Sequence, residues 1–185
     1  AQLDEVLKKY PMPPPDTPEQ IREKEAMVEE TLPKVYELLE AAKQDPKKID
    51  EVVELSMSML VLLPGHRAAK VAYSKAQLAS FFAKEATDEH GKMLDEHHMA
   101  VAIRSACLEI NRLRKNYDDL SEDEVQLCQK IYFNRARMEG IYHSEPAEFI
   151  ATINKLMSAG FSDVERLKAE PRFEYFFTDP KTAPV

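Results

Sequence analysis

Apolar side chains recur every three or four residues along most of the chain, which is the period of a helix buried on one face. The longest uninterrupted run alternates steps of four and three, at Met99, Ile103, Ala106, Ile110, Leu113, Tyr117 and Leu120. A second run extends from Ile21 to Ala42 in steps of seven, four and three. The pattern predicts an all-α fold, either an antiparallel helical bundle or an irregular helical array of about six to seven helices.

Capping residues, prolines and glycines mark where these helices begin and end. Thr17 precedes Pro18 and stands three residues before Gln20, which is a capping box with proline at the first helical position. Similar helix starts occur at Asp45-Pro46, at Ser121 with Glu124 and at Ser162 with Glu165, the last two being capping boxes. Helix ends are marked by Pro64-Gly65 and Ala159-Gly160. Pro33 removes one helical hydrogen bond, so we expect a kink or short break near Thr31. Short turns predict antiparallel neighbours.

The chain divides into a helical body and two ends of different composition. Residues 1–17 are expected to form an extended proline-rich arm, because Pro11 to Pro15 include four prolines. Residues 18–170 are predicted to be one all-helical domain. Residues 171–185 are predicted to be an aromatic tail that ends in an extended, proline-containing segment.

Composition narrows the range of functions. The chain has 185 residues with 33 acidic and 25 basic side chains, a net charge of −8, which argues against general binding to nucleic acid or anionic membranes. The longest apolar run, 55–63, is far shorter than a membrane-spanning helix, so no membrane insertion is expected. Two cysteines inside helical patterns favour an intracellular, reducing compartment, either cytoplasm or organelle matrix. Cys107 and Cys128 are both interpreted as buried small side chains rather than nucleophiles.

One cluster has side chains that bind metals, namely His90, Asp95, His97 and His98. On a helix, His90 and His97 would lie about 10.5 Å apart along the axis, too far for one ion. We therefore predict no metal site and no cofactor. A metal-dependent helical enzyme built on Asp95, His97 and His98, with His90 or His143 supplied across a turn, is an alternative.

A second cluster is basic and consists of Arg112, Arg114, Arg135 and Arg137. If their helices pack antiparallel, the guanidinium groups could bind an anion or a partner, and a nucleic-acid accessory factor is a further alternative. The favoured interpretation is ordinary ion pairing with nearby acidic residues, because mixed charge is typical of solvated helices. Those residues are Glu109, Asp118, Asp119 and Glu124.

The leading hypothesis is a non-enzymatic helical accessory subunit or adaptor that docks into a larger assembly through its ends and one helix face. The partners are expected to be other protein subunits, in a hetero-assembly. The side chains predicted to contact them are Tyr10, Met12, Phe173, Tyr175, Phe176 and Phe177. Residues 1–63 hold fourteen acidic and eight basic side chains, which suits a basic partner.

Overall fold

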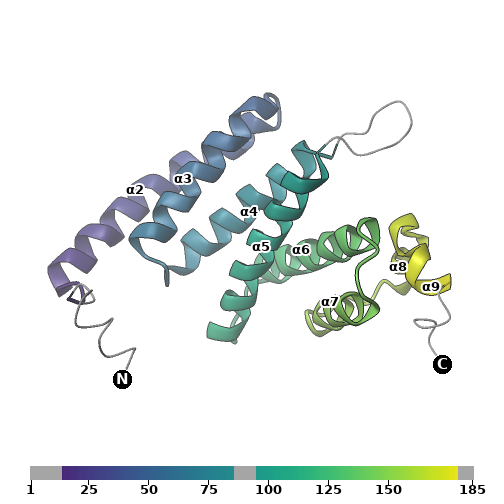
Figure 1. Ribbon diagram of the computed structural model, residues 1–185. Coiled ribbons are helices and arrows are strands. Elements are labelled where there is room, and N and C mark those ends of the chain that lie inside the picture. The colour runs from purple at the N-terminus through teal and green to yellow at the C-terminus, as the bar shows by residue number, and fades with distance from the viewer. Residues whose placement is uncertain (1–13, 86–94, 179–185) are drawn as a thin grey trace, which may run out of the picture.

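The computed structural model describes residues 14–85 and 95–178, and within these ranges the regular structure is entirely helical (Figure 1). The all-α prediction is confirmed. The α-helices of this part are α2 (Pro18–Ala42), α3 (Ile49–Leu62), α4 (Arg67–Ala83), α5 (Glu96–Asn116), α6 (Glu122–Ile141), α7 (Pro146–Ser158), α8 (Val164–Ala169) and α9 (Glu174–Thr178). Two 3₁₀ turns, η1 (Pro46–Lys48) and η2 (Pro171–Phe173), precede α3 and α9. The helix number exceeds the prediction because residues after Gly160 fold into short pieces.

Two of the three predicted capping boxes form as expected. Gln20 N donates to Thr17 Oγ1 at 3.2 Å, and Thr17 N donates to the Gln20 side chain at 2.8 Å. Ser121 and Glu124 make the same reciprocal pair at the start of α6. The third box is wrong by one residue, because Asp163 rather than Ser162 caps α8, accepting from Arg166 N at 2.9 Å.

Of the kink or short break expected near Thr31, the break does not occur, since α2 is continuous through Pro33. Thr31 Oγ1 donates to the carbonyl of Met27 at 2.7 Å, inside an unbroken helix. Val28 and Val35, on either side of the proline, are both fully buried in one core. Packing on both sides of Pro33 therefore outweighs the single hydrogen bond that proline removes.

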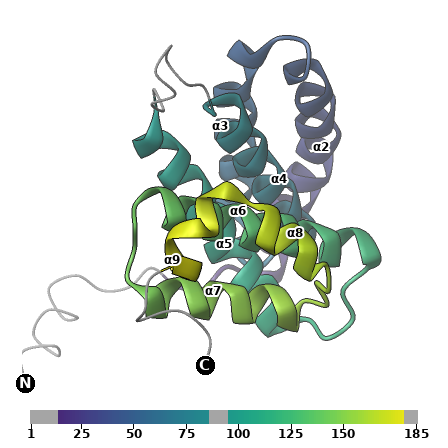
Figure 2. The ribbon, with the colours of Figure 1, turned by 90° about the vertical axis from the view of Figure 1, so that its right-hand side faces the viewer.

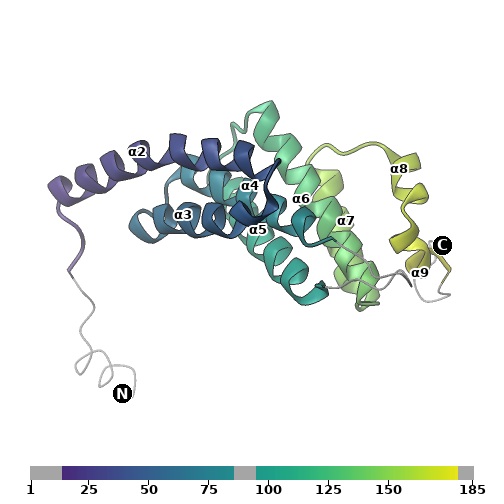
Figure 3. The same cartoon turned by 90° about the horizontal axis from the view of Figure 1, so that it is seen from above.

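The first six α-helices form three successive hairpins, α2–α3, α4–α5 and α6–α7, in which each helix packs on the next. Helix α4 also contacts α2 and α6. In Figure 1, α3 and α5 lie in front of α2 and α4, and the turned views in Figures 2 and 3 show the same two layers. The fold is a helical array, with α8, η2 and α9 at its C-terminal end.

Helix α4 separates two hydrophobic cores. Its alanine face, with Ala69, Ala72 and Ala76, packs against α2 and α3 in the first core. The opposite side, with Leu78 and Phe81, belongs to the second core, which α5 to α9 complete. The small alanines permit the close helix approach that the sequence predicts.

The four-and-three run of apolar positions in α5 is part of the second core. Met99, Ile103, Ala106, Ile110 and Leu113 are all buried there. The helix ends at Asn116, and the last two positions of the run follow it as half-buried loop residues packed on the same core. This face is thus internal and is not a seam for dimerisation.

Candidate functional site

The aromatic segment near the C-terminus packs largely inside the protein. Phe173 and Phe176 are 0% and 1% exposed, so their predicted contact with a partner is wrong. Phe176 stacks on Phe149 with ring centroids 3.9 Å apart, and Phe173 meets the same ring at 5.1 Å. Because aromatic side chains bury large apolar areas, the segment 171–178 adopts helical turns on the second core, and the extended segment predicted after it lies outside the described residues.

The other aromatic residues of this segment lie at the surface. Tyr175 stacks on His143, with ring centroids 4.4 Å apart and planes 7° from parallel. His143 has a φ of 48° because it ends α6 in a Schellman turn, in which Ser144 N donates to the Glu139 carbonyl at 2.9 Å. Phe177 is 42% exposed, so it stays a predicted partner contact, as does Tyr175.

The two predicted contacts in the N-terminal arm, Tyr10 and Met12, lie outside the described residues.

The four arginines of the basic cluster make contacts within the chain. Arg112 pairs with Glu109 at 2.6 Å, as the favoured interpretation predicts. Others use acidic partners that the sequence pattern did not indicate: Arg135 pairs with Glu139 at 2.8 Å, and Arg137 pairs with Glu85 and Glu170.

Arg114 binds backbone oxygen atoms rather than a carboxylate. Its guanidinium donates to the carbonyls of Lys155 at 3.3 Å and Ser158 at 3.1 Å, which lie at the C-terminal end of α7. A cation there interacts favourably with the carbonyl end of the α7 dipole. The guanidinium also lies 5.6 Å from the centre of the Tyr132 ring. Arg114 therefore connects α5 with α6 and α7.

The histidine–carboxylate cluster forms one exposed pair in the structure. His98 contacts the Asp95 carboxylate, and this contact lowers the pKa of Asp95. The ring of His97 meets the ring of His98 edge to face, and His90 is outside the described residues. Across 14–85 and 95–178, no group of three or more histidine, cysteine, aspartate or glutamate side chains is arranged to hold a metal ion.

Both cysteines are free thiols that burial makes harder to ionise. Cys128 is fully buried, and burial raises its pKa to about 11. Cys107 is half-buried, and burial raises its pKa too. Since the thiolate is the reactive form, this environment is typical of structural cysteines.

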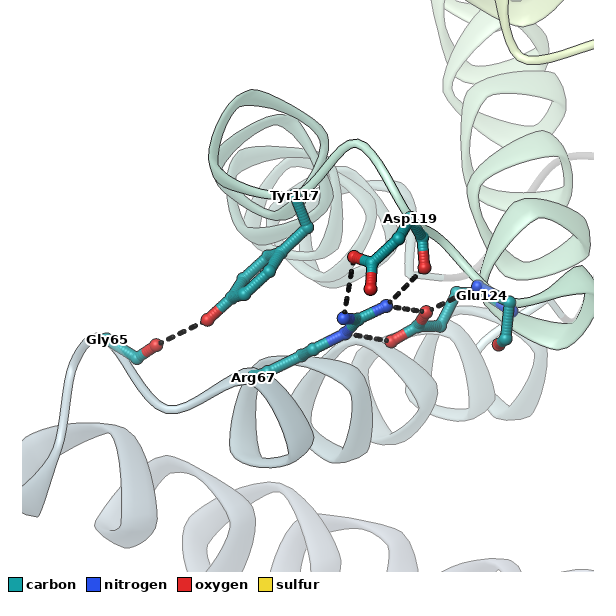
Figure 4. Close-up of polar contacts among 6 residues, drawn as sticks. Gly65, Arg67, Tyr117, Asp119 and Glu124 are labelled. Carbon is teal, nitrogen blue, oxygen red and sulfur yellow. Dashed lines mark hydrogen bonds and ion pairs between the residues drawn. The ribbon is translucent and has the colours of Figure 1, made fainter.

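The most extensive polar network connects two turns of the array (Figure 4). Arg67, the first residue of α4, donates from Nε and Nη2 to the two carboxylate oxygens of Glu124, at 2.9 and 2.6 Å. The same guanidinium donates to the side chain and the carbonyl of Asp119, both at 3.0 Å. It also lies 4.6 Å from the centre of the Tyr117 ring. Arg67 thus uses all three of its nitrogens across the α3–α4 and α5–α6 turns.

The electrostatics of this network are those of a structural ion pair. The hydrogen bond from Arg67 is the main cause that lowers the pKa of Glu124 to about 2, so the carboxylate is ionised at neutral pH. Sequence reasoning missed the network and treated the segment from Pro64 to Arg67 as a turn only. The partners of Arg67 are 52 and 57 residues away, and no local signal relates them.

A buried ion pair connects α4 with α5 inside the second hairpin. Lys70 donates to Glu109 Oε2 at 3.3 Å and to the carbonyl of Pro64, and both charged side chains are more than nine-tenths buried. Removing Glu109 would leave the buried Lys70 ammonium without a counter-charge, whereas Glu109 also pairs with Arg112, so the contact with Lys70 fixes the register of α4 against α5.

A second buried carboxylate lies where α6 meets α7. Glu139 Oε1 accepts from Arg135 Nε and Thr152 Oγ1, both at 2.8 Å, and burial raises its pKa.

Two open clefts are present in the described part of the chain. One of about 290 Å³ lies beside Arg114, Tyr117 and Ser158, and one of about 380 Å³ lies beside His143 and Tyr175. Arg114 and His143 already make the structural contacts described above.

Exposed apolar side chains recur in the second helix of every hairpin. Each helix carries two of them, four or seven residues apart and therefore on one face. The pairs are Met57 and Val61 on α3, Val101 and Leu108 on α5, and Ile150 and Met157 on α7. Their exposed fractions run from 42% for Met157 to 75% for Val61. We call these six side chains the outer apolar pairs.

Comparisons of the chain with protein-family models, with curated proteins and with solved structures find no match. In the ranges that the structure describes, no helix has the length and apolar character needed to cross a membrane.

Proposed function

We propose that the chain is a non-enzymatic helical adaptor or structural subunit that docks into a larger protein assembly through its outer helix faces. The observation that carries the proposal is the repetition of the outer apolar pairs on α3, α5 and α7. Single exposed apolar residues are common on proteins, but the same arrangement on three successive hairpins favours a surface that other chains cover.

The arrangement of the charged groups supports the same proposal. Arg67 and Arg114 connect the second hairpin with the third, and Lys70 connects α4 with α5 and with the α3–α4 turn, so the spacing of the outer faces is held by polar contacts as well as by the cores. A preorganised surface loses little conformational freedom when a partner binds. An adaptor needs such a surface, whereas an enzyme needs converging reactive groups in a cleft.

The magnitude is consistent with docking through several faces at once. Burying a Val, Leu, Ile or Met side chain completely contributes about 1.5–3 kcal/mol, and roughly half of that remains available for a half-exposed side chain. The six outer side chains together could then contribute on the order of 6 kcal/mol. Association itself costs about 4–15 kcal/mol, so one apolar pair alone does not offset this cost, and the three pairs together offset the lower end of the range before polar contacts are added.

The test is the size of the native protein in a gentle extract at its normal level. We expect it to elute far above 21.2 kDa, the mass of one chain. A variant with serine at all six outer positions should keep the melting temperature of the wild type but elute as a free monomer. A wild-type protein that elutes as a monomer, or a six-serine variant that stays in the large species, contradicts the proposal.

A further inference from the structure

The second half of α3 has no charged side chain on any face. From Leu55 to Leu62 its only polar side chains are those of two serines, and Met59 points into the first core. Val61, at 75% exposed, and Met57, at 46%, lie on the opposite side. A helix in contact with water normally has a polar outer face, so this half of α3 has the character of a helix with neighbours on both sides.

The serines within this segment do not make it a polar surface. Ser58 Oγ donates to the carbonyl of Leu55 at 2.7 Å, and Ser56 Oγ donates to the carbonyl of Val53 at 3.0 Å. Each hydroxyl donor is therefore satisfied inside the helix. When a partner covers Ser58, the hydroxyl still has its acceptor inside the helix. Removing water from the outer face therefore costs little free energy.

The first half of α3 is acidic, in contrast to its second half. Asp50, Glu51 and Glu54 are all exposed, and no basic residue occurs anywhere in the helix. Glu54 lies on the same side as Met57 and Val61, one and two turns before them. The outer face of α3 is thus acidic at its start and apolar at its end.

We infer that the outer face of α3 binds an amphipathic helix of a partner protein that carries lysine or arginine beside its apolar side. This inference rests on the proposed function and names the chemistry of one of its partners. Glu54 and Val61 are seven residues apart, about 10.5 Å along the axis. The partner helix therefore places its basic side chains one to two turns from the apolar residues that cover Met57 and Val61.

Charge decides between this partner and a second copy that uses the same face. Packing this face of α3 on the same face of another copy offers Glu51 and Glu54 no basic side chain of α3, so their carboxylates repel or stay unpaired. A basic helix instead pairs with Glu51 and Glu54, while Asp50 already pairs with Lys84 at 3.4 Å, in the region of the chain that carries −6 of the net charge of −8. The unbranched side chain of Met57 adapts to the shape of whatever covers it.

The test uses the full chain with ¹³C-labelled methionine and valine methyl groups and a synthetic helical peptide of leucine and lysine. The peptide has leucine on one face and lysine on its flanks, and a matched peptide has glutamate in place of lysine. We expect the lysine peptide, at physiological salt, to shift the methyl signals of Met57 and Val61 and to leave those of Val101 and Met157 unchanged. The glutamate peptide should bind at least tenfold more weakly.

Two matched double variants locate the binding surface. M57S/V61S should weaken binding of the lysine peptide at least tenfold, while V101S/L108S, which removes an equally exposed pair from α5, should leave it unchanged. Equal binding of both peptides, or loss of binding in V101S/L108S, overturns the inference. Self-association of the wild type that M57S/V61S abolishes overturns it as well, since the occupant is then a second copy. If M57S/V61S remains in the native assembly and the peptide fails to bind, the inference fails while the proposed function stands.

Discussion

Replacing Phe173 by alanine tests whether the C-terminal segment belongs to the core. The side chain is 0% exposed, and its ring lies 5.1 Å from that of Phe149 and 5.6 Å from that of Phe133. Truncating a fully buried phenylalanine costs about 3–5 kcal/mol, because the lost apolar contacts leave a cavity. A chain of this length loses about 2–4 °C in melting temperature per kcal/mol, so we expect a decrease of roughly 6–20 °C.

The assay is thermal unfolding followed by circular dichroism at 222 nm, with Phe177→Ala as the matched control. Phe177 lies four residues further on and is 42% exposed, so its truncation should cost less than about 1 kcal/mol and a few degrees. If the two variants melt within 2 °C of each other, Phe173 does not support the core. The segment would then be free to contact a partner, as the sequence pattern alone had indicated.

Two further substitutions and one chemical modification test other contacts in the structure. Gly140→Ala should destabilise the fold despite the better helix propensity of alanine, because a Cβ there would lie 1.9 Å from the carbonyl oxygen of Arg172. Glu124→Gln should lower the melting temperature at pH 7, and its difference from the wild type should shrink as pH falls from about 4.5 towards 2. Cys107 and Cys128 should react slowly with a thiol reagent in the native protein and rapidly in denaturant, because burial raises the pKa of both.

Each of these three predictions would be contradicted by a specific result. If Gly140→Ala leaves the melting temperature unchanged, η2 does not pack on α6 as described. Gly65→Ala is the control, because the new methyl group there meets open space. The Glu124 carboxylate has a folded-state pKa of about 2, below its ordinary value of 4.5, so its stabilisation is present above pH 4.5 and is lost on acidification. A difference between Glu124→Gln and the wild type that stays constant from pH 7 to 2 contradicts the ion pair. Rapid modification of both thiols without denaturant contradicts their burial.

Local signals in the sequence predict where helices begin and end and which face they bury. They do not predict which distant residues come into contact. The cap at Thr17 and the buried face from Met99 to Leu113 were predictable because each depends on residues within one or a few turns. The cap of α8 was displaced by one residue because both Ser162 and Asp163 are suitable capping residues.

The candidate site was harder to predict because it depends on which helices meet. Phe173 resembles a surface anchor in the sequence, and only the packing of η2 on α6 places it in the core. Arg67 has no local partner, and its contacts with Asp119 and Glu124 exist only because α4 lies beside the α5–α6 turn. The sequence pattern could identify the apolar character of Val61 but not its exposure, since an apolar run alone indicates a buried helix.

Oxidation of methionine side chains, compared between the isolated chain and the native assembly, tests the docking of the outer helix faces most directly. Met57 and Met157 are 46% and 42% exposed, while Met59 and Met99 are 0% exposed and serve as internal controls. Docking of the outer helix faces predicts that Met57 and Met157 oxidise readily in the isolated chain and are protected in the assembly, with both controls protected throughout. Equal oxidation of Met57 and Met157 in the two states would contradict it.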